Sequence, residues 1–492
     1  MSIRTPLRKW ERPKKLMEVY PSGRPPFYPF PTVTNLVNAA FCPVAVFHEL
    51  LHGVYQDVTA LPSTNWRLFG AGELFQDFIA LLKSLIAKGE LYLTGIDTIR
   101  HEFFSFARRI DDRTRDLLWD HYLEPWCRRK FEEIRKIKQG EQLFFEITAS
   151  CAYVQFAHDG GTRTYPLLGV IDEIQIDNRK IIERTIKGKP EDNDPPNMKD
   201  YQVWLLWKIL CSVNRSDYPE KWKNIDFSDF DLFVETPYRD FKVTKHNPEF
   251  DKYTHEAYAW IYDLTFDRRA EWEVYQHKRC AYAARRDECG LVGWCYRRKQ
   301  PYPASRPEMR RVFKDMYRPL LWEQMWNYHL FQYKLVMLQL QALESIGLVS
   351  RGKIVSFSEG KFEVEVPADQ ADPMWARREV ETRYMILPFG TFFVGKRIEA
   401  TFKGRKGNRL IIEVPKQEIP TSETVLILPV KSDLPILETQ PWYLTRWIQR
   451  DMFSLEYAGT KDPVRAGKDS IVQMLESLFG QKALRREGVE QS

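Results

Sequence analysis

The sequence predicts an α/β fold with helical insertions, followed by a small β-barrel. Apolar residues recur at helical spacing up to about residue 138, and the two-residue alternation typical of strands dominates residues 143–186. Alternation returns in residues 346–430, interrupted by turn residues at short intervals, which is typical of a compact barrel. A chain of 492 residues has room for several such parts.

Changes in composition along the chain predict five parts. They are a basic, Pro-rich arm (1–31), the α/β domain with its insertions (32–300), a helical connector (301–345), the β-barrel (346–430) and a helical C-terminal tail (431–492). The first part has no periodicity, so an extended arm and a disordered leader remain alternatives. Residues 213–275 are aromatic and mixed in character, and we predict no element there.

Composition limits the classes of protein to which the chain can belong. Its 73 basic and 67 acidic residues give a net charge of +6, which alone does not indicate nucleic-acid binding. No run of 18 apolar residues is present, so we expect no membrane span. The N-terminus lacks the apolar stretch of a secretory leader, so we expect a cytoplasmic protein. In that reducing compartment, clustered cysteines indicate metal ligands before disulfides.

Helical patterns precede the strands. They cover residues 32–42, 46–54 and 73–88, with Gly89 as the stop of the third, and continue as charged amphipathic helices over 96–138. The apolar stripe of the third helix consists of Leu74, Phe78, Leu81, Leu82 and Leu85. Strand patterns follow over residues 143–149, 152–159, 167–176 and 180–186. A helix begins near Pro195 after these strands.

The last two strand patterns form a hairpin around Asp177-Asn178, a pair suited to a tight turn. A two-residue loop there places Asp172 directly opposite Glu183, with Cβ atoms roughly 4.5–5.5 Å apart. Two carboxylates this close repel each other unless a cation lies between them, and a hard divalent ion such as Mg²⁺ or Mn²⁺ meets that need. An ordinary hairpin with both acids facing solvent is the alternative, because strand registers are easily misjudged by one residue.

Strand parity brings a lysine into the same region. Residues 183, 185 and 187 share one face of the strand, so Thr185 and Lys187 lie alongside Glu183. A lysine there would steady an attacking water or the charge that develops on a phosphate.

These residues resemble a known family. Asp172, preceded by Gly169-Val-Ile, and Glu183 on the next strand resemble the D…ExK core of RecB-type PD-(D/E)XK nucleases. The segment Asp200–Trp204 looks like the glutamine motif of that class. Upstream, Phe41-Cys42-Pro43 and Gly72–Gln76 are similar to the start of the CRISPR-associated adaptation nuclease and of the nuclease part of the eukaryotic replication helicase–nuclease.

The resemblance implies a restriction-endonuclease-like core that cleaves DNA, at single strands or ends, in DNA repair, CRISPR adaptation or phage defence. Asp172 and Glu183 would bind the metal, and Gln76 would complete the site where the family has a histidine. Lys187 would assist catalysis, because Thr185 stands where the family has its lysine. Gln202 would position DNA.

The resemblance also implies a 4Fe–4S iron–sulfur cluster held by one cysteine before the core and three after it. The matching residues are Cys42, Cys280, Cys289 and Cys295. The spacing between the last two fits the family, whereas eight residues separate Cys280 from Cys289 where the family usually has two. Zinc on the four thiolates, with His277 as a further ligand, and buried free cysteines are the alternatives. Cys127, Cys151 and Cys211 lie in apolar or mixed runs and are predicted to be structural thiols.

Partners follow from the parts around the core. The barrel resembles those that accompany helicases or dock on DNA translocases, so we expect DNA and a helicase or translocase in trans as partners. Arg285-Arg286 and Arg297-Arg298-Lys299 would line a strand channel or form a solvated rim.

Three other hypotheses compete with an active nuclease. The core would be catalytically degenerate and bind only DNA or a partner. His48-Glu49-Leu-Leu-His52 is a formal zinc-peptidase pattern, with Glu73 as a third ligand. Gly390–Arg397 nearly matches a phosphate-binding loop, but Arg397 replaces the required Ser or Thr and no helix pattern follows, so we exclude an ATPase motor.

Overall fold

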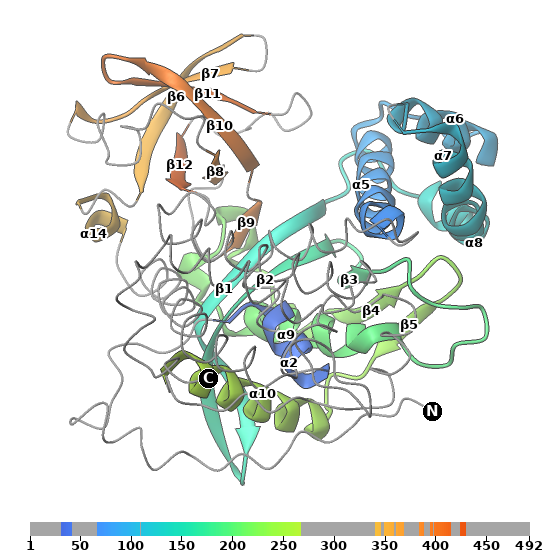
Figure 1. Ribbon diagram of the computed structural model, residues 1–492, viewed down its shortest axis with the longest axis horizontal. Helices are drawn as coiled ribbons and strands as arrows, with labels where there is room; N and C mark the ends of the chain where they lie inside the picture. The colour runs from blue at the N-terminus through green and yellow to red at the C-terminus, as the bar shows by residue number, and fades with distance from the viewer. Residues whose placement is uncertain are drawn as a thin grey trace, which may run out of the picture. The chain divides into compact units, whose positions relative to one another are not determined.

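The structure is a computed structural model that contains two sheets and a set of helices (Figure 1). It describes residues 31–41, 66–108, 110–266, 340–345, 349–358, 361–368, 383–387, 394–396, 398–414 and 424–429. The chain divides into one compact unit of Met1–Phe41, Arg67–Asp263 and Tyr328–Leu434, and another of Cys42–Trp66, Leu264–Asn327 and Pro435–Ser492. Mixed helix and sheet is therefore confirmed as the fold class at this coarse level, whereas the predicted boundaries stay predictions.

The first sheet has six strands in the order β5-β4-β3-β2-β1-β9. The strands are β1 (Leu143–His158), β2 (Gly161–Gln175), β3 (Lys180–Arg184), β4 (Asp231–Glu235), β5 (Asp240–Val243) and β9 (Val394–Lys396). Strands β3 and β4 are parallel, and the other pairs are antiparallel. A parallel pair needs a crossover, and α9 (Lys199–Ser212) lies between these two strands in the sequence.

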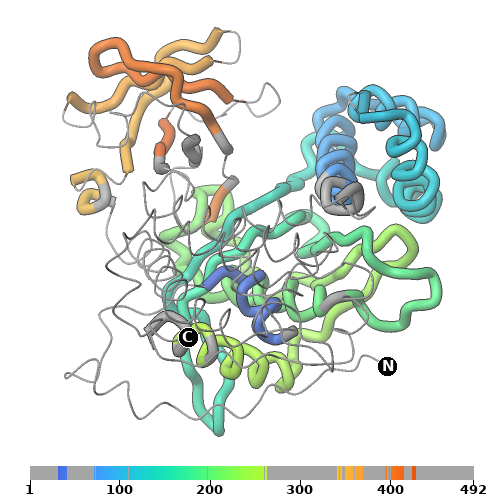
Figure 2. Tube along the Cα trace, in the orientation of Figure 1, coloured from blue at the N-terminus to red at the C-terminus, as the bar shows by residue number. Residues whose placement is uncertain are grey.

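Strands β1 and β2 form one long antiparallel hairpin. Figure 2 shows the two strands running side by side. The prediction of separate strands over 143–149 and 152–159 was wrong. The intervening Ser150 and Cys151 contain no turn signal, and a bulge between Cys151 and Val154 absorbs the irregularity. The turn comes at Asp159-Gly160, both with positive φ, so β2 begins six residues earlier than predicted.

The strands that sequence reasoning missed lie in residues 213–275. Strands β4 and β5 form a short hairpin there, and α10 (Pro248–Phe266) follows. Each strand has only four or five residues, which is too short for a clear alternation.

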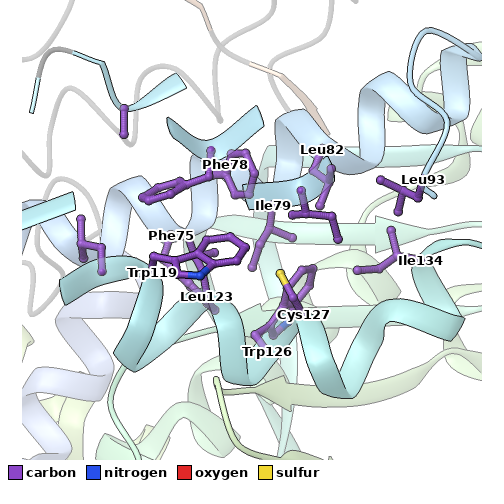
Figure 3. Close-up of a cluster of buried hydrophobic side chains, with 14 of the residues drawn as sticks. Phe75, Phe78, Ile79, Leu82, Leu93, Trp119, Leu123, Trp126, Cys127 and Ile134 are labelled. Atoms are coloured by element: carbon purple, nitrogen blue, oxygen red, sulfur yellow. The ribbon is translucent and has the colours of Figure 1, made fainter. Parts of the chain in front are cut away.

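Four helices with a shared core are inserted before the sheet. They are α5 (Trp66–Lys88), α6 (Ile96–Phe106), α7 (Asp112–Leu118) and α8 (Glu124–Ile134), with a π-turn over Trp119–Leu123 between the last two. Gly89 has a φ of 75° and ends α5 as predicted. Figure 3 shows this core. The ring centroids of Phe78 and Phe103, both buried in it, lie 5.2 Å apart.

Helix α2 (Val33–Phe41) begins at a reciprocal cap. The main-chain N–H of Thr32 donates to Asn35 Oδ1, and that of Asn35 donates to Thr32 Oγ1, both at 3.0 Å. Val33 packs against β2 at Gly169, where a Cβ would lie 2.4 Å from Leu206 Cδ2 and 2.9 Å from Val33 Cγ2. Glycine is therefore required at this position by close approach rather than by backbone conformation.

The second sheet closes on itself. Its strands are β6 (Ser350–Ser358), β7 (Lys361–Glu365), β8 (Arg383–Leu387), β10 (Ile398–Lys406), β11 (Arg409–Glu413) and β12 (Thr424–Pro429), and α14 (Leu340–Ser345) precedes them. The order is β10-β11-β7-β6-β12-β8, with β8 pairing back to β10. Apolar residues from these strands, including Phe362, Val364 and Leu410, fill the interior. Within the described part of the chain, no helix has the length and apolar character needed to cross a bilayer.

Replacing Gly169 by alanine is expected to lower the free energy of unfolding by about 1–3 kcal/mol, because its methyl group would overlap Leu206 and Val33. Gly72→Ala is the matched control: Gly72 lies inside α5 with nothing within 4 Å of an added Cβ, so this change should stabilise by about 0.5–1 kcal/mol. Urea unfolding measures both. Equal effects of the two substitutions would contradict the packing at Gly169.

His255 on α10 gives the fold a pH dependence. Its Nε2 donates to Ala157 O and its Nδ1 accepts from Tyr165 Oη, both at 2.7 Å. Burial, with the neighbouring His158 and Arg163, lowers the pKa of His255 below its usual 6.5. The unfolded chain thus binds this proton more readily, and stability should fall as the pH drops from about 6.5 through the folded pKa.

This dependence is measured by thermal unfolding between pH 8 and pH 5. The His255→Gln variant should show a smaller loss on acidification than the unaltered protein. His101→Gln should leave the profile unchanged, since the His101 side chain is 84% exposed. Identical profiles for His255→Gln and the unaltered protein would exclude His255 as the source.

Candidate active site

The candidate site lies at the open end of the β2–β3 hairpin, away from its turn. Strand β2 pairs with β3 through Glu173 and Ile182, Ile174 and Ile181, and Gln175 and Lys180, which is the predicted register. The turn is closed by the N–H of Arg179, which donates to Ile176 O at 3.2 Å. Continued by one position, this register sets Asp172 opposite Glu183.

The regular ladder between β2 and β3 stops before that position, and side chains take over. Asp172 Oδ2 accepts the main-chain N–H of Arg184 at 2.6 Å. It also accepts from Gln76 Nε2 at 3.1 Å, and the same nitrogen donates to Arg184 O at 3.1 Å. Asp172 is thus held by a neighbouring strand and by α5.

Gln76 therefore has a different contact from the one expected. A carbonyl oxygen can only accept, so the contact with Arg184 O fixes the amide of Gln76 with its nitrogen toward Asp172. In this geometry Gln76 orients the carboxylate as a donor and does not present its own carbonyl beside it. To act as the predicted metal ligand, Gln76 would have to rotate its side-chain amide so that the carbonyl oxygen faces the site.

Glu183 is almost fully enclosed, with 1% of its side chain exposed. One oxygen, Oε1, accepts from Lys199 Nζ and from Gln202 Nε2, both at 2.6 Å. The other oxygen, Oε2, is buried and has no hydrogen-bond partner among the described residues. A buried carboxylate oxygen with an open coordination position is costly unless a further group occupies it.

The electrostatics of the pair follow from this enclosure. Burial and the neighbouring Asp172 carboxylate raise the pKa of Glu183 to about 8. Desolvation also raises the pKa of Asp172, against the opposing effects of Lys199 and the Arg184 N–H. Burial would lower the pKa of Lys199, but Glu183 and Asp172 outweigh it and the net shift is upward. The two acids and the ammonium therefore form one electrostatic group.

The lysine that donates to Glu183 is Lys199. Strand β3 ends at Arg184, and the hydrogen bond from Thr185 N–H to Glu235 O completes its parallel pairing with β4. Lys187 is exposed and lies beyond the end of the strand, and its predicted place alongside Glu183 stays a prediction. Lys199 comes from the first turn of α9, three residues before Gln202, and this helical spacing was the signal that could have identified it.

The residues present fit a hard divalent cation. Among the described residues, no three His, Cys, Asp or Glu side chains gather closely enough to hold a metal by themselves. Mg²⁺ needs fewer, because it is commonly bound through one or two carboxylates and keeps several waters. Asp172 and Glu183, whose Oε2 has no hydrogen-bond partner among the described residues, are the two carboxylates that could hold such an ion.

A buried ionic cluster lies directly behind the site. The Arg184 side chain, 1% exposed, pairs with Glu173 and places Nε 3.0 Å from Glu235 Oε1. Lys83 Nζ donates to both oxygens of Glu173 at 3.0 Å, and Trp126 Nε1 donates to Glu235 at 2.7 Å. Sequence reasoning missed this cluster, which fixes the residue whose main chain binds Asp172.

Positive charge dominates the surroundings of Glu235. Its carboxylate lies 3.5 Å from Lys130 Nζ in addition to Arg184. Burial would raise the pKa of Glu235, but Arg184, Lys83 and Lys130 hold it far below its usual range. Glu235 is therefore a charged anchor of the cluster.

Several predicted residues lie outside the described part of the chain. These are Cys42, Cys280, Cys289, Cys295, His277, the pattern His48-Glu49-His52 and the basic clusters at 285–286 and 297–299. The side chain of Glu73 is likewise outside it. Cys127 and Cys151 are buried free thiols, and Cys211 is a free thiol on an exposed residue. Part of the rejected phosphate-binding pattern forms β9, in keeping with its exclusion.

No protein-family model matches the sequence. No curated protein matches it either.

Arg184→Met is expected to lower the free energy of unfolding by about 3–5 kcal/mol, because it leaves Glu173 and Glu235 buried without this partner. Lys242→Met, which breaks an exposed ion pair with Asp231, should cost about 1 kcal/mol or less. Urea unfolding of both variants provides the comparison. A small effect of Arg184→Met would show that the cluster is not a significant source of stability.

Proposed function

We propose that the protein is a metal-dependent deoxyribonuclease of the PD-(D/E)XK class. The observation that carries the proposal is that Asp172 lies beside Glu183, whose Oε2 is buried and has no hydrogen-bond partner among the described residues. A divalent cation bound there would supply Lewis-acid chemistry to a phosphodiester and to an attacking water. The enclosed surroundings strengthen each electrostatic interaction in the site.

The chain's own residues have distinct parts in this proposal. Asp172 and Glu183 hold the cation. Gln76 and the Arg184 N–H fix the orientation of Asp172. Gln202 holds Glu183 Oε1, and Lys199, whose side chain is 20% exposed, presents a positive charge at the edge of the site toward a phosphate.

The local order of elements supports the same class. Two acidic residues on neighbouring strands are followed by a helix that returns a glutamine to one of them, which is the arrangement expected from the resemblance. A substrate with phosphodiester bonds also suits a site in which one cation and one lysine lie beside two acids.

A catalytically degenerate domain that binds DNA or a partner is the second candidate. The observation in its favour is that Lys199 and Gln202 already satisfy one oxygen of Glu183, while Gln76 donates where the resemblance expects an imidazole. This candidate predicts that DNA is retained but remains intact with any divalent metal.

Three further proposals rest on the sequence and its family resemblance alone. They are a 4Fe–4S cluster or zinc on the four cysteines, a helicase or translocase in trans, and a cytoplasmic place in DNA repair, CRISPR adaptation or phage defence. The zinc-peptidase hypothesis likewise stays a prediction. A broad absorption band near 400 nm in anaerobically purified protein would identify the cluster.

Asp172→Asn and Glu183→Gln are each expected to reduce Mg²⁺- or Mn²⁺-dependent cleavage of labelled single-stranded DNA by roughly a hundredfold or more. Both changes keep side-chain size while removing a charged ligand. Asp194→Asn is the matched control, since Asp194 is exposed in the loop after β3, and its activity should be unchanged.

Gel analysis of end-labelled and internally labelled strands measures the cleavage and shows whether ends are required. Equal cleavage by the unaltered protein and both site variants would remove the acid pair from the mechanism. Binding without cleavage by every protein, in either metal, would favour the degenerate candidate.

A further inference from the structure

Lys199 occupies an unusual place in the candidate site. It is the first residue of α9, directly after Met198, whose φ of 57° redirects the chain into the helix. Its Nζ lies 2.6 Å from Glu183 Oε1, and part of the side chain remains exposed. The ammonium therefore contacts an enclosed carboxylate although the Lys199 side chain is not fully buried.

The charge of the acid pair makes this contact more than a local ion pair. Two carboxylates that are close together and poorly solvated need a counter-charge. The Arg184 guanidinium lies nearby, but Glu173 and Glu235 bind it behind the site. Lys199 interacts electrostatically with both Asp172 and Glu183. It thus meets the same need that a divalent cation would meet.

We propose that Lys199 is a tethered counter-ion of the metal-free site and that it holds the divalent-metal affinity down. This inference rests on the proposed metal site of Asp172 and Glu183. When a cation binds Glu183 Oε2, two positive charges share one enclosed carboxylate, and each weakens the hold of the other. By linkage the effect is reciprocal, so metal binding loosens the Lys199–Glu183 pair.

Competition between Lys199 and the metal for Glu183 would also affect how the site binds DNA. A loosened Lys199 ammonium needs a new anionic partner, and a DNA phosphate provides one. Metal binding would then prepare a phosphate contact at the edge of the site, and a bound phosphate would in turn favour metal binding. The full charge of the site would be balanced only when metal and nucleic acid are both present.

The test is the affinity of the full-length protein for Mn²⁺ without DNA, measured by calorimetry or by the loss of the free-ion electron spin resonance signal. Lys199→Met should bind Mn²⁺ roughly tenfold more tightly than the unaltered protein, because it removes one positive charge beside the ligand. Lys199→Gln should also bind more tightly, and Lys199→Arg should stay close to the unaltered protein. Lys189→Met removes the same charge from an exposed position and should change the affinity less than twofold.

Thermal unfolding gives a readout that does not depend on activity. In EDTA, Lys199→Met should unfold at a lower temperature than the unaltered protein, because the acid pair has lost its counter-charge. Mn²⁺ should raise the unfolding temperature of Lys199→Met by more than it raises that of the unaltered protein. Lys199→Gln repeats both measurements if Lys199→Met does not fold.

The outcomes separate this inference from the proposed function. Mn²⁺ binding that is lost in Asp172→Asn but is equal or weaker in both neutral Lys199 variants would overturn the inference and leave the metal site standing. No Mn²⁺ binding by any protein, together with no DNA cleavage, would overturn the proposed function and the inference with it.

Discussion

The candidate site depends on the fixed position of Arg184. Its main chain binds Asp172 through the N–H and Gln76 through the carbonyl, while its side chain is bound by Glu173 and Glu235. One residue therefore couples a buried ionic cluster to the geometry of the acid pair. Because the cluster is enclosed, a small displacement of the guanidinium would leave charges without partners, and this cost restrains the end of β3. The carboxylate of Asp172 takes its orientation from that strand end.

The register of the acid pair was predictable because it depends on short-range information. A turn pair between two alternating runs fixes every cross-strand partner of a hairpin, and the observed pairing of Glu173 with Ile182 follows it. The ionic cluster was not predictable in this way. Lys83 and Glu173 lie 90 residues apart in the sequence, and Trp126 and Glu235 lie 109 apart. No local periodicity relates such residues, since tertiary packing alone brings α5, α8 and β4 together.

The same distinction explains the errors within the sheet. Strand β1 continues through Cys151 and Val154 because a bulge absorbs the break between the two predicted strand patterns, and a bulge has no strong sequence signal. Strand β4 pairs in parallel with β3, and α9 forms the crossover between them. The five residues of β4 are therefore defined as a strand by their pairing in the sheet and not by a local sequence pattern. The sequence therefore predicted the β2–β3 hairpin, and missed β4, the strand that needs the crossover. Glu235, which anchors the ionic cluster, belongs to that missed part.

The contact between Lys199 and Glu183 shows what the acid pair requires physically. Strand alternation places residues only along β3, and that strand ends at Arg184, one residue after Glu183. The enclosed Glu183 still needs a positive charge within hydrogen-bonding distance, and its position in the sequence is irrelevant to that need. Helix α9 satisfies it because Lys199 and Gln202 project from the same side, one turn apart, and converge on one oxygen. The convergence leaves Oε2 open, so the lysine neutralises the acid without filling its remaining coordination position. A site that only had to fold would gain from satisfying both oxygens, and the unpartnered oxygen is the observation on which the proposed cation rests.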